Sequence, residues 1–205
     1  MVNLVCLDLE GVLIPEIWKG LAALTKIEAL NRTTRDEPDY DVLMKYRLKI
    51  LDEHKIGMNE VKEVVAQMDP LEGAVEFLNW LRAQTQVIIL SDTFFEFAQP
   101  LLAKLGYPTV FCHNLEIAEN GQILDYHLRQ EDPKRHAVQN LQRMNFKVTA
   151  AGDSYNDLPM LLNADHSIFY CPPDSIIAEY PDIPVTTDYK GLADAIGTSV
   201  PCSRF

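Results

Sequence analysis

The chain alternates between short apolar runs and longer segments with helical periodicity. Four apolar runs predict strands that are covered on both faces of a sheet, and they begin at Leu4, Val87, Val148 and Ser167. Apolar residues recur every three or four positions in four further segments, which predicts helices over 74–83, 95–105, 134–144 and 157–164. This alternation predicts an α/β fold with a doubly wound parallel sheet, whose ligands bind beyond the carboxyl ends of the strands.

Residues 14–69 interrupt the alternation with helical patterns only, clearest over 40–54 and 58–68. A helical insert that directly follows the first strand would overhang the strand ends, so we expect a small helical cap. The predicted division is a catalytic core of 1–13 and 70–205 with a cap of 14–69. A second interruption at 115–128 places Asn120-Gly121 between two alternating runs, which predicts a hairpin. The tail 198–205 has no periodicity and is expected to fray.

Composition narrows the class of protein. The chain has 205 residues and a net charge of −12, and no cluster of Lys and Arg could follow a phosphate backbone, so we expect no nucleic-acid partner. The four cysteines are far apart and lack a C-x-x-C spacing, and the five histidines form no metal-binding pattern, so both sets are expected to be structural. The N-terminus has no signal-peptide pattern and no apolar run is long enough to span a membrane, which predicts a cytoplasmic protein without membrane contact.

Acidic residues gather where the predicted strands end. Asp8 and Glu10 follow the first strand, Asp92 follows the second after Ser91, and Asp153 follows the third. The carboxyl ends of parallel strands lie at one edge of a sheet, so these carboxylates would converge and repel one another. A hard divalent cation and an anionic ligand would neutralise them, and Mg²⁺ with a substrate phosphate fits oxygen ligands. Asp8 could then attack phosphorus and form an aspartyl phosphate.

Four short segments together resemble the haloacid dehalogenase superfamily of phosphatases. They are "DLEG", "LSDT", "DPKR" and "GDSYND", and they follow one another in the order and the strand context of that family. The resemblance implies a Rossmann-like core in which Asp8 is the nucleophile and Glu10 the acid and base. It implies phosphate binding by Ser91, Asp92 and Lys134, and a Mg²⁺ site made by Asp8, Asp153 and the backbone carbonyl of Glu10, supported by Asn156 and Asp157. The family usually has Asp where this chain has Glu10, whose reach is longer by about 1.5 Å.

Within that superfamily the chain is most similar to phosphoserine phosphatases. In those enzymes a Glu after the first motif binds the substrate ammonium. A cap helix carries an aromatic residue and, seven positions later, an Arg that binds the substrate carboxylate. Glu16, Tyr40 and Arg47 match this pattern. The segments "DLEGVLIPE" and "PDYDVLMK" resemble those members of the branch that also transfer the phosphoryl group to homoserine. The implied small-molecule partners are therefore phosphoserine and homoserine.

Alternatives remain for several of these residues. Glu16 could simply stabilise the N-terminus of a helix, Arg47 could belong to a solvated charged face, and Asp92 could be a surface acid. A receiver-like signalling module also uses a strand-end Asp with a Ser or Thr and a Lys, but it would need neither the insert 14–69 nor "GDSYND". A phosphatase or mutase for another small phosphorylated metabolite is the second alternative.

Overall fold

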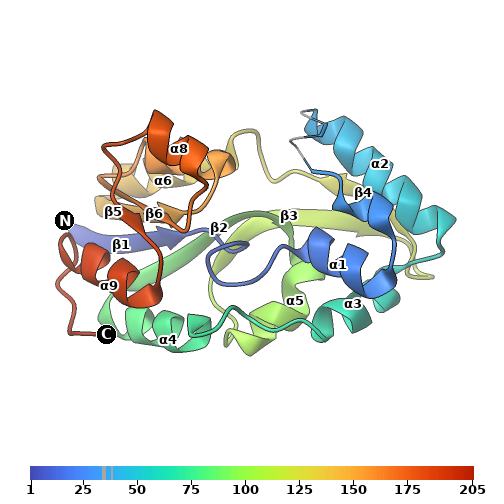
Figure 1. Ribbon diagram of the computed structural model, residues 1–205, viewed down its shortest axis with the longest axis horizontal. Coiled ribbons are helices and arrows are strands. Elements are labelled where there is room, and N and C mark those ends of the chain that lie inside the picture. Colours follow the sequence, from blue (N-terminus) through green and yellow to red (C-terminus); the bar gives the residue numbers. More distant parts are fainter. Residues whose placement is uncertain (34–35, 38) are drawn as a thin grey trace.

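A computed structural model describes residues 1–33, 36–37 and 39–205 of the chain. The described residues form a seven-stranded sheet with the order β4-β3-β2-β1-β5-β6-β7, in which only the β3–β4 pair is antiparallel. The strands are β1 (Val2–Leu7), β2 (Gln86–Phe94), β3 (Val110–Ile117), β4 (Ile123–His127), β5 (Phe146–Gly152), β6 (His166–Tyr170) and β7 (Val185–Thr186). The prediction of a doubly wound parallel sheet is confirmed (Figure 1).

Strand β1 lies in the middle of the sheet, which explains its unbroken apolar sequence. It pairs in parallel with β2 on one side and with β5 on the other, so that Leu7 lies between Ile89 and Ala151. Its residues Val5, Cys6 and Leu7 have no exposed surface. Because both faces of a central strand are covered, alternation with polar residues would bury polar groups here. Asp8 is the first residue after this buried strand, so its carboxylate lies at the edge of the sheet.

Helices cover both faces of the sheet (Figure 1). On one face α6, α7 and α8 pack around one apolar cluster, and on the other face α4, α5 and α9 share a second cluster with the helices of 14–69. The bounds are α4 (Ala74–Gln84), α5 (Phe95–Lys104), α6 (Pro133–Arg143), α7 (Leu158–Leu161), α8 (Asp174–Glu179) and α9 (Tyr189–Gly197). The predicted helix over 157–164 is shorter than expected, because a 3-10 turn, η2 (Tyr155–Asp157), precedes α7.

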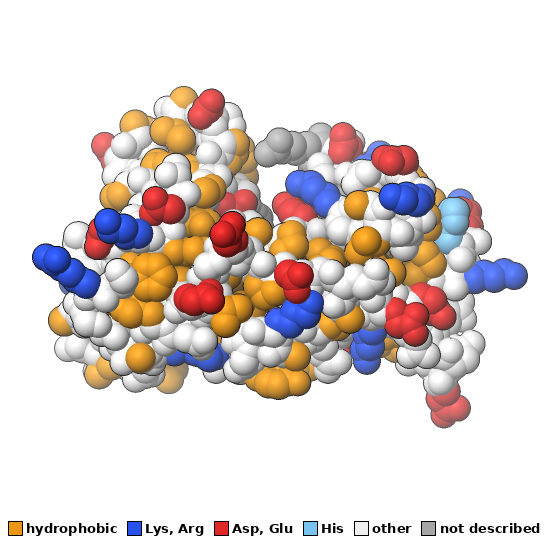
Figure 2. Space-filling model, turned by 60° about the horizontal axis from the view of Figure 1, so that its bottom comes forward, with side chains coloured by type: hydrophobic (Ala, Val, Ile, Leu, Met, Phe, Trp, Pro, Cys, Tyr) orange, Lys and Arg blue, Asp and Glu red, His pale blue; other side chains and the backbone are white. Residues whose placement is uncertain are grey.

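The predicted cap segment 14–69 consists of helices, as expected. They are α1 (Ile17–Thr25), the 3-10 turn η1 (Glu28–Asn31), α2 (Tyr40–Glu53) and α3 (Met58–Ala66). They lie at one end of the molecule, and α3 packs along α5 of the core (Figure 1). In the space-filling view, acidic side chains border the notch that separates this end from the lobe of α6 and α8 (Figure 2).

The β3–β4 hairpin forms as predicted and is attached to the cap segment. At its tip the Gly121 carbonyl accepts a hydrogen bond from the Met58 N–H (2.8 Å), and Gln122 Nε2 donates to Asp52 Oδ1 (2.9 Å). At its other end the Tyr126 hydroxyl donates to Asp41 Oδ1 (2.7 Å). Through these hydrogen bonds the hairpin supports α2. Hydrophobic periodicity in the sequence does not predict this connection.

The expectation that the tail frays is wrong. The Phe205 ring lies 5.8 Å from Phe77 and 5.3 Å from Trp80, measured between ring centroids. The Ser203 N–H donates to Gln84 Oε1 (2.9 Å). Aromatic contacts of this kind stabilise a chain end that lacks periodicity of its own. None of the described helices has both the length and the apolar character needed to cross a membrane.

Candidate active site

Asp8 and Ser91 meet at the carboxyl edge of the sheet, as predicted. Asp8 is 3% exposed, and its N–H donates to the Ala151 carbonyl (2.9 Å), which extends the pairing of β1 with β5 by one residue. Ser91 lies within β2, which continues to Phe94 and so extends beyond the predicted strand end, and it is also 3% exposed. Its Oγ accepts a hydrogen bond from the Thr93 N–H (3.2 Å), which leaves its hydroxyl hydrogen for another acceptor.

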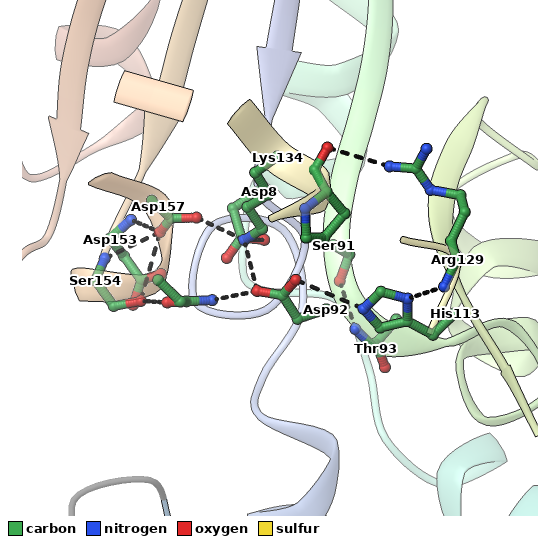
Figure 3. A network of polar contacts seen from close by, with 12 residues as sticks. Asp8, Ser91, Asp92, Thr93, His113, Arg129, Lys134, Asp153, Ser154 and Asp157 are labelled. Atoms are coloured by element: carbon green, nitrogen blue, oxygen red, sulfur yellow. Dashed lines mark hydrogen bonds and ion pairs between the residues drawn. The ribbon is translucent and has the colours of Figure 1, made fainter. Parts of the chain in front are cut away.

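Lys134 brings a buried positive charge to these acids. It stands in the first turn of α6, is 2% exposed, and donates from Nζ to Asp8 Oδ1 (2.8 Å) and Asp157 Oδ1 (2.6 Å). Its Nζ also lies 3.5 Å from Asp92 Oδ2 (Figure 3). Burial alone would lower the pKa of Lys134, but the three carboxylates hold it well above its ordinary value. The ammonium is thus charged and placed beside Asp8, where it can also meet an anionic group.

Asp157 holds the loop that follows β5. Its side chain has no exposed surface, and its Oδ2 accepts hydrogen bonds from the N–H groups of Asp153 (2.9 Å) and Ser154 (3.0 Å). Gly152 makes this approach possible, since a Cβ at that position would lie 2.4 Å from Asp157 Cγ. Asp157 therefore links Lys134 to the loop that carries Asp153.

The carboxylates of Asp8, Asp153 and Asp157 make a set that fits a hard divalent cation. Each offers an oxygen, and these oxygens lie within 4.8 Å of one another. Burial, together with the charges of Asp157 and Asp153, raises the pKa of Asp8 well above its ordinary value, although Lys134 acts in the opposite sense. Burial and the Asp157 charge likewise raise the pKa of Asp153 to about 7. One ammonium does not balance this cluster, and Mg²⁺ prefers such oxygen ligands.

Glu10 lies between the first strand and the predicted cap. Its Oε2 accepts a hydrogen bond from the Ile17 N–H (2.9 Å), at the N-terminus of α1. Burial raises the pKa of Glu10 to about 7, and the bond from Ile17 opposes that rise. The longer side chain of Glu is therefore anchored at its far end to the start of a helix, where the dipole favours negative charge.

The three predicted substrate-binding residues differ in their surroundings. Arg47 is 8% exposed, its guanidinium lies 4.6 Å from the centroid of the Trp18 ring, and its Nη2 donates to the Arg32 carbonyl (2.7 Å). Burial lowers the pKa of Arg47, while Tyr40, Glu10 and Glu16 act to raise it, so these groups share one region. Within the described part of the chain, Arg47 Nε is a buried donor without a partner. The structure therefore rejects a solvated charged face as the explanation of Arg47.

Tyr40 and Glu16 flank that region. The Tyr40 ring makes an edge contact with Tyr126 of the hairpin at a centroid distance of 5.9 Å. Burial, followed by the charge of Asp92, raises the pKa of Tyr40. Glu16 is the residue directly before α1. Its side chain is about half exposed and lies 3.5 Å from the Lys19 ammonium. A helix-stabilising role thus remains open for Glu16.

Asp92 lies at the site, but its carboxylate faces protein donors. Asn156 Nδ2 donates to Asp92 Oδ2 (3.0 Å), and His113 Nε2 lies 3.8 Å from Asp92 Oδ1 (Figure 3). Burial acts to raise the pKa of Asp92, but Lys134, His113 and Asn156 hold it well below its ordinary value. An anionic carboxylate cannot donate to a phosphoryl oxygen, so only the backbone N–H of Asp92 could serve the phosphate binding predicted for this residue.

His113 is the residue that sequence reasoning missed. The sequence predicts only a structural role for it, because the spacing of the five histidines matches no metal-binding pattern. The structure places it in β3, 3% exposed, where its ring contacts Phe94 and its Nε2 points at Asp92. The parallel pairing of β3 with β2 creates this neighbourhood, and a single sequence gives no signal for it beyond the predicted hairpin.

Gly11 provides a test of the predicted cation site. Its φ of +84° is unfavourable for other residues, and an added Cβ would lie 2.4 Å from Asp153 Oδ2. We expect Gly11→Ala to lower the free energy of unfolding by about 1 to 2 kcal/mol and to raise the Mg²⁺ concentration needed for half-maximal activity roughly tenfold. Thermal unfolding and a Mg²⁺ titration measure the two effects. In the control Gly197→Ala, the new Cβ meets no atom within 4 Å; an unchanged Mg²⁺ requirement in Gly11→Ala would remove Asp153 from the cation site.

Comparison with known proteins agrees with this geometry. The family of haloacid dehalogenase-like hydrolases matches residues 2–165. The chain is 53% identical to a phosphoserine phosphatase ThrH of Pseudomonas aeruginosa, over 93% of both chains. It is 52% identical to a phosphoserine phosphatase of Pseudomonas syringae pv. tomato, over 93% of this chain and 81% of that one.

Solved structures agree on the fold. A crystal structure of a phosphoserine phosphatase in apo form has a TM-score of 0.75 and 20% identity, and it covers 95% of this chain and 98% of its own. A substrate-bound phosphoserine phosphatase has a TM-score of 0.76 and 19% identity, over 97% of this chain and 98% of its own. The resemblance drawn from the four sequence motifs is confirmed at the level of the family and the fold.

Proposed function

This chain belongs to the haloacid dehalogenase-like hydrolase family, and on that premise we propose that it is a Mg²⁺-dependent phosphoserine phosphatase. The observation that carries the proposal is the Asp8 carboxylate, buried at the end of β1 and bonded at 2.8 Å to the ammonium of Lys134. The two relatives that are 53% and 52% identical bear the name of this activity. We also retain the cytoplasmic location as a prediction.

In the proposed reaction an oxygen of Asp8 attacks the phosphorus atom of phosphoserine and forms an aspartyl phosphate. The Ser91 hydroxyl and the Lys134 ammonium donate to the phosphoryl oxygens and stabilise the charge that builds up on them. Glu10 gives its proton to the serine oxygen as the ester bond breaks. It then takes a proton from water, which attacks phosphorus, releases phosphate and restores Asp8. Glu10 suits both steps because burial raises its pKa to about 7.

Asp8, Asp153 and the backbone carbonyl of Glu10 would hold Mg²⁺, with Asn156 and Asp157 supporting their loop. When bound, the ion would neutralise the carboxylates and polarise the phosphoryl group. A screen of phosphorylated metabolites tests the proposed activity, with Mg²⁺ in one arm and a chelator in the other. We expect phosphoserine to be hydrolysed fastest and only with Mg²⁺. A clear preference for a sugar phosphate would favour the alternative of another small phosphorylated metabolite.

We propose that residues 14–69 act as the cap that selects the substrate. Arg47 would bind the substrate carboxylate through two parallel hydrogen bonds, with Tyr40 beside it and Glu16 near the ammonium. Arg47 Nε is buried and has no partner among the described residues, which supports this role, because a buried donor without an acceptor is costly and a bound carboxylate would supply one.

Arg47→Ala should lower kcat/KM for phosphoserine. The fall should correspond to a loss of about 2 to 5 kcal/mol in transition-state stabilisation. Hydrolysis of p-nitrophenyl phosphate, which has no carboxylate to bind, should change little. Steady-state kinetics on both substrates measures the difference. Arg47→Lys keeps the charge without the planar fork and should fall between Ala and the original protein, and Lys49→Ala on the exposed face of the same helix serves as control. Equal losses on both substrates would show that Arg47 supports the cap rather than the substrate.

We further propose that the aspartyl phosphate can pass its phosphoryl group to homoserine. Homoserine is serine with one more methylene, so the ammonium and carboxylate that Glu16 and Arg47 would bind are both present. A hydroxyl held in place has an orientational advantage over water, and Glu10 could take its proton. Phosphorus NMR of the protein with phosphoserine, homoserine and Mg²⁺, without ATP, tests this step. Phosphohomoserine should appear beside free phosphate; phosphate alone at saturating homoserine would leave the protein a phosphatase only.

A further inference from the structure

The carboxylate of Asp92 poses a problem for a site that binds phosphate. Its Oδ2 lies 3.5 Å from Lys134 Nζ, which already bonds to Asp8 and Asp157. A carboxylate that moved closer to this ammonium would take the place of a phosphoryl oxygen. It would also add a negative charge where an anionic substrate must enter, and like charges at such range repel. The protein therefore needs groups that hold Asp92 in place.

Two side chains face the Asp92 carboxylate, one at each oxygen (Figure 3). Asn156 Nδ2 donates to Oδ2 (3.0 Å), and His113 Nε2 faces Oδ1 at 3.8 Å. Asn156 comes from the segment after β5 and His113 from β3. These strands lie on opposite sides of β2, the strand that carries Asp92. Asn156 and Lys134 face the same oxygen, Oδ2, whereas His113 of the hairpin faces the other oxygen, Oδ1.

The backbone fixes which nitrogen of His113 carries the proton. His113 Nδ1 accepts a hydrogen bond from the Arg129 N–H (3.0 Å), so in the neutral ring the proton resides on Nε2, the atom that faces Asp92. Arg129 also contacts the start of α6, because its Nη2 donates to the carbonyl of Pro133 (3.2 Å), the residue directly before Lys134. One short segment thus orients both the His113 ring and the start of the helix that carries Lys134.

We propose that His113 is a positioning residue, which holds the Asp92 carboxylate away from Lys134 so that the ammonium remains available to the phosphoryl group. This inference rests on the proposed phosphoryl chemistry of the site, but it does not depend on serine as the leaving group. It explains why a buried histidine of the hairpin faces the one strand-end acid that neither attacks nor joins the predicted cation set. His113 acts through Asp92 and touches no reacting atom.

Two substitutions separate this role from a structural one. His113→Asn keeps an acceptor near the Arg129 N–H and loses the donor toward Asp92, whereas His113→Gln keeps a donor at the reach of Nε2 and loses the acceptor. We expect His113→Asn to raise the KM for p-nitrophenyl phosphate and the inhibition constant of inorganic phosphate about tenfold, with kcat changed less than about threefold. His113→Gln should stay within about threefold of the original protein in both constants. The reverse ranking would show that His113 acts through Arg129 and would overturn the proposal.

The dependence on Asp92 is tested by repeating His113→Asn in an Asp92→Asn background. The neutral amide in this background does not compete for the ammonium. His113→Asn should therefore change the phosphate inhibition constant less than about twofold in the Asp92→Asn background, against about tenfold in the original background. Equal factors in the two backgrounds would contradict the proposal. A measurement on the unmodified protein needs no variant to fold: nitrogen NMR should find the His113 proton on Nε2, and a proton on Nδ1 would refute the assignment.

These readouts also separate the inference from the proposed function. They use p-nitrophenyl phosphate and inorganic phosphate, neither of which contains serine. If the protein hydrolyses p-nitrophenyl phosphate but not phosphoserine, the substrate assignment fails and the ranking of His113 variants still decides this proposal. If phosphoserine is hydrolysed and the ranking is reversed, only the role of His113 falls.

Discussion

Asp8→Asn should yield a folded protein that no longer turns over phosphoserine, with a loss in kcat of roughly a thousandfold or more. The amide oxygen of asparagine is a poor nucleophile, so the covalent step has no replacement among the neighbouring groups. Asparagine can still accept the hydrogen bond that Lys134 Nζ now donates to Asp8 Oδ1. The substitution also removes one charge from a crowded cluster, so we expect no loss of stability.

Steady-state kinetics, thermal unfolding and phosphate binding together measure this prediction. The melting temperature should be equal to or above that of the original protein, and inorganic phosphate should still bind. Asp125→Asn, an exposed acid on β4, is the matched control and should keep full activity. Substantial residual turnover in Asp8→Asn would mean that another group attacks phosphorus and would remove the nucleophile assignment.

Lys134→Met is expected to have the second largest effect, on stability as well as on activity. The Lys134 ammonium is buried and bonds to the buried carboxylates of Asp8 and Asp157, so its removal leaves buried negative charges without this partner. Breaking such a group by removing one member costs about 3 to 5 kcal/mol. Activity should also fall to near background, because the phosphoryl oxygens lose their charged donor.

The loss of stability in Lys134→Met should depend on pH. Without the ammonium, the folded-state pKa of Asp8 rises further above its unfolded value, and such a group destabilises the fold increasingly as pH rises above the unfolded value. The deficit should therefore be largest near neutral pH and shrink toward about pH 4. Chemical denaturation across that range measures it, with the exposed Lys190→Met as control. A deficit that is the same at every pH would mean that lost packing, rather than unpaired charge, explains the change.

The sequence predicts part of the sheet edge, because several of the proposed catalytic side chains stand beside a recognisable buried strand. Asp8, Ser91 and Asp153 could be located from the apolar runs before them, and the parallel topology then requires that they meet. Lys134 could be assigned only through the family motif, since nothing local distinguishes the first residues of an amphipathic helix as buried. The structure shows it 2% exposed between Asp8 and Asp157, which lie 126 and 23 positions away in the sequence.

What the sequence did not predict depends on contacts between distant elements. His113 faces Asp92 because β3 pairs with β2 around an irregular register, and no periodicity encodes that irregularity. The attachment of the hairpin tip to Met58 and the packing of Phe205 on Trp80 are equally nonlocal. Patterns of burial predict which face of an element is covered; they do not identify the element that covers it.

If Asp8 carries the phosphoryl group during turnover, the covalent aspartyl phosphate can be trapped on the protein. Radiolabelled phosphoserine, mixed with the protein and Mg²⁺ and quenched in acid within milliseconds, should leave label on the peptide that contains Asp8. That label should be released by hydroxylamine, as expected for an acyl phosphate, and should be absent from Asp8→Asn. Label on a hydroxyl or imidazole side chain, or rapid hydrolysis without any labelled protein, would show that Asp8 is not the residue that carries the phosphoryl group.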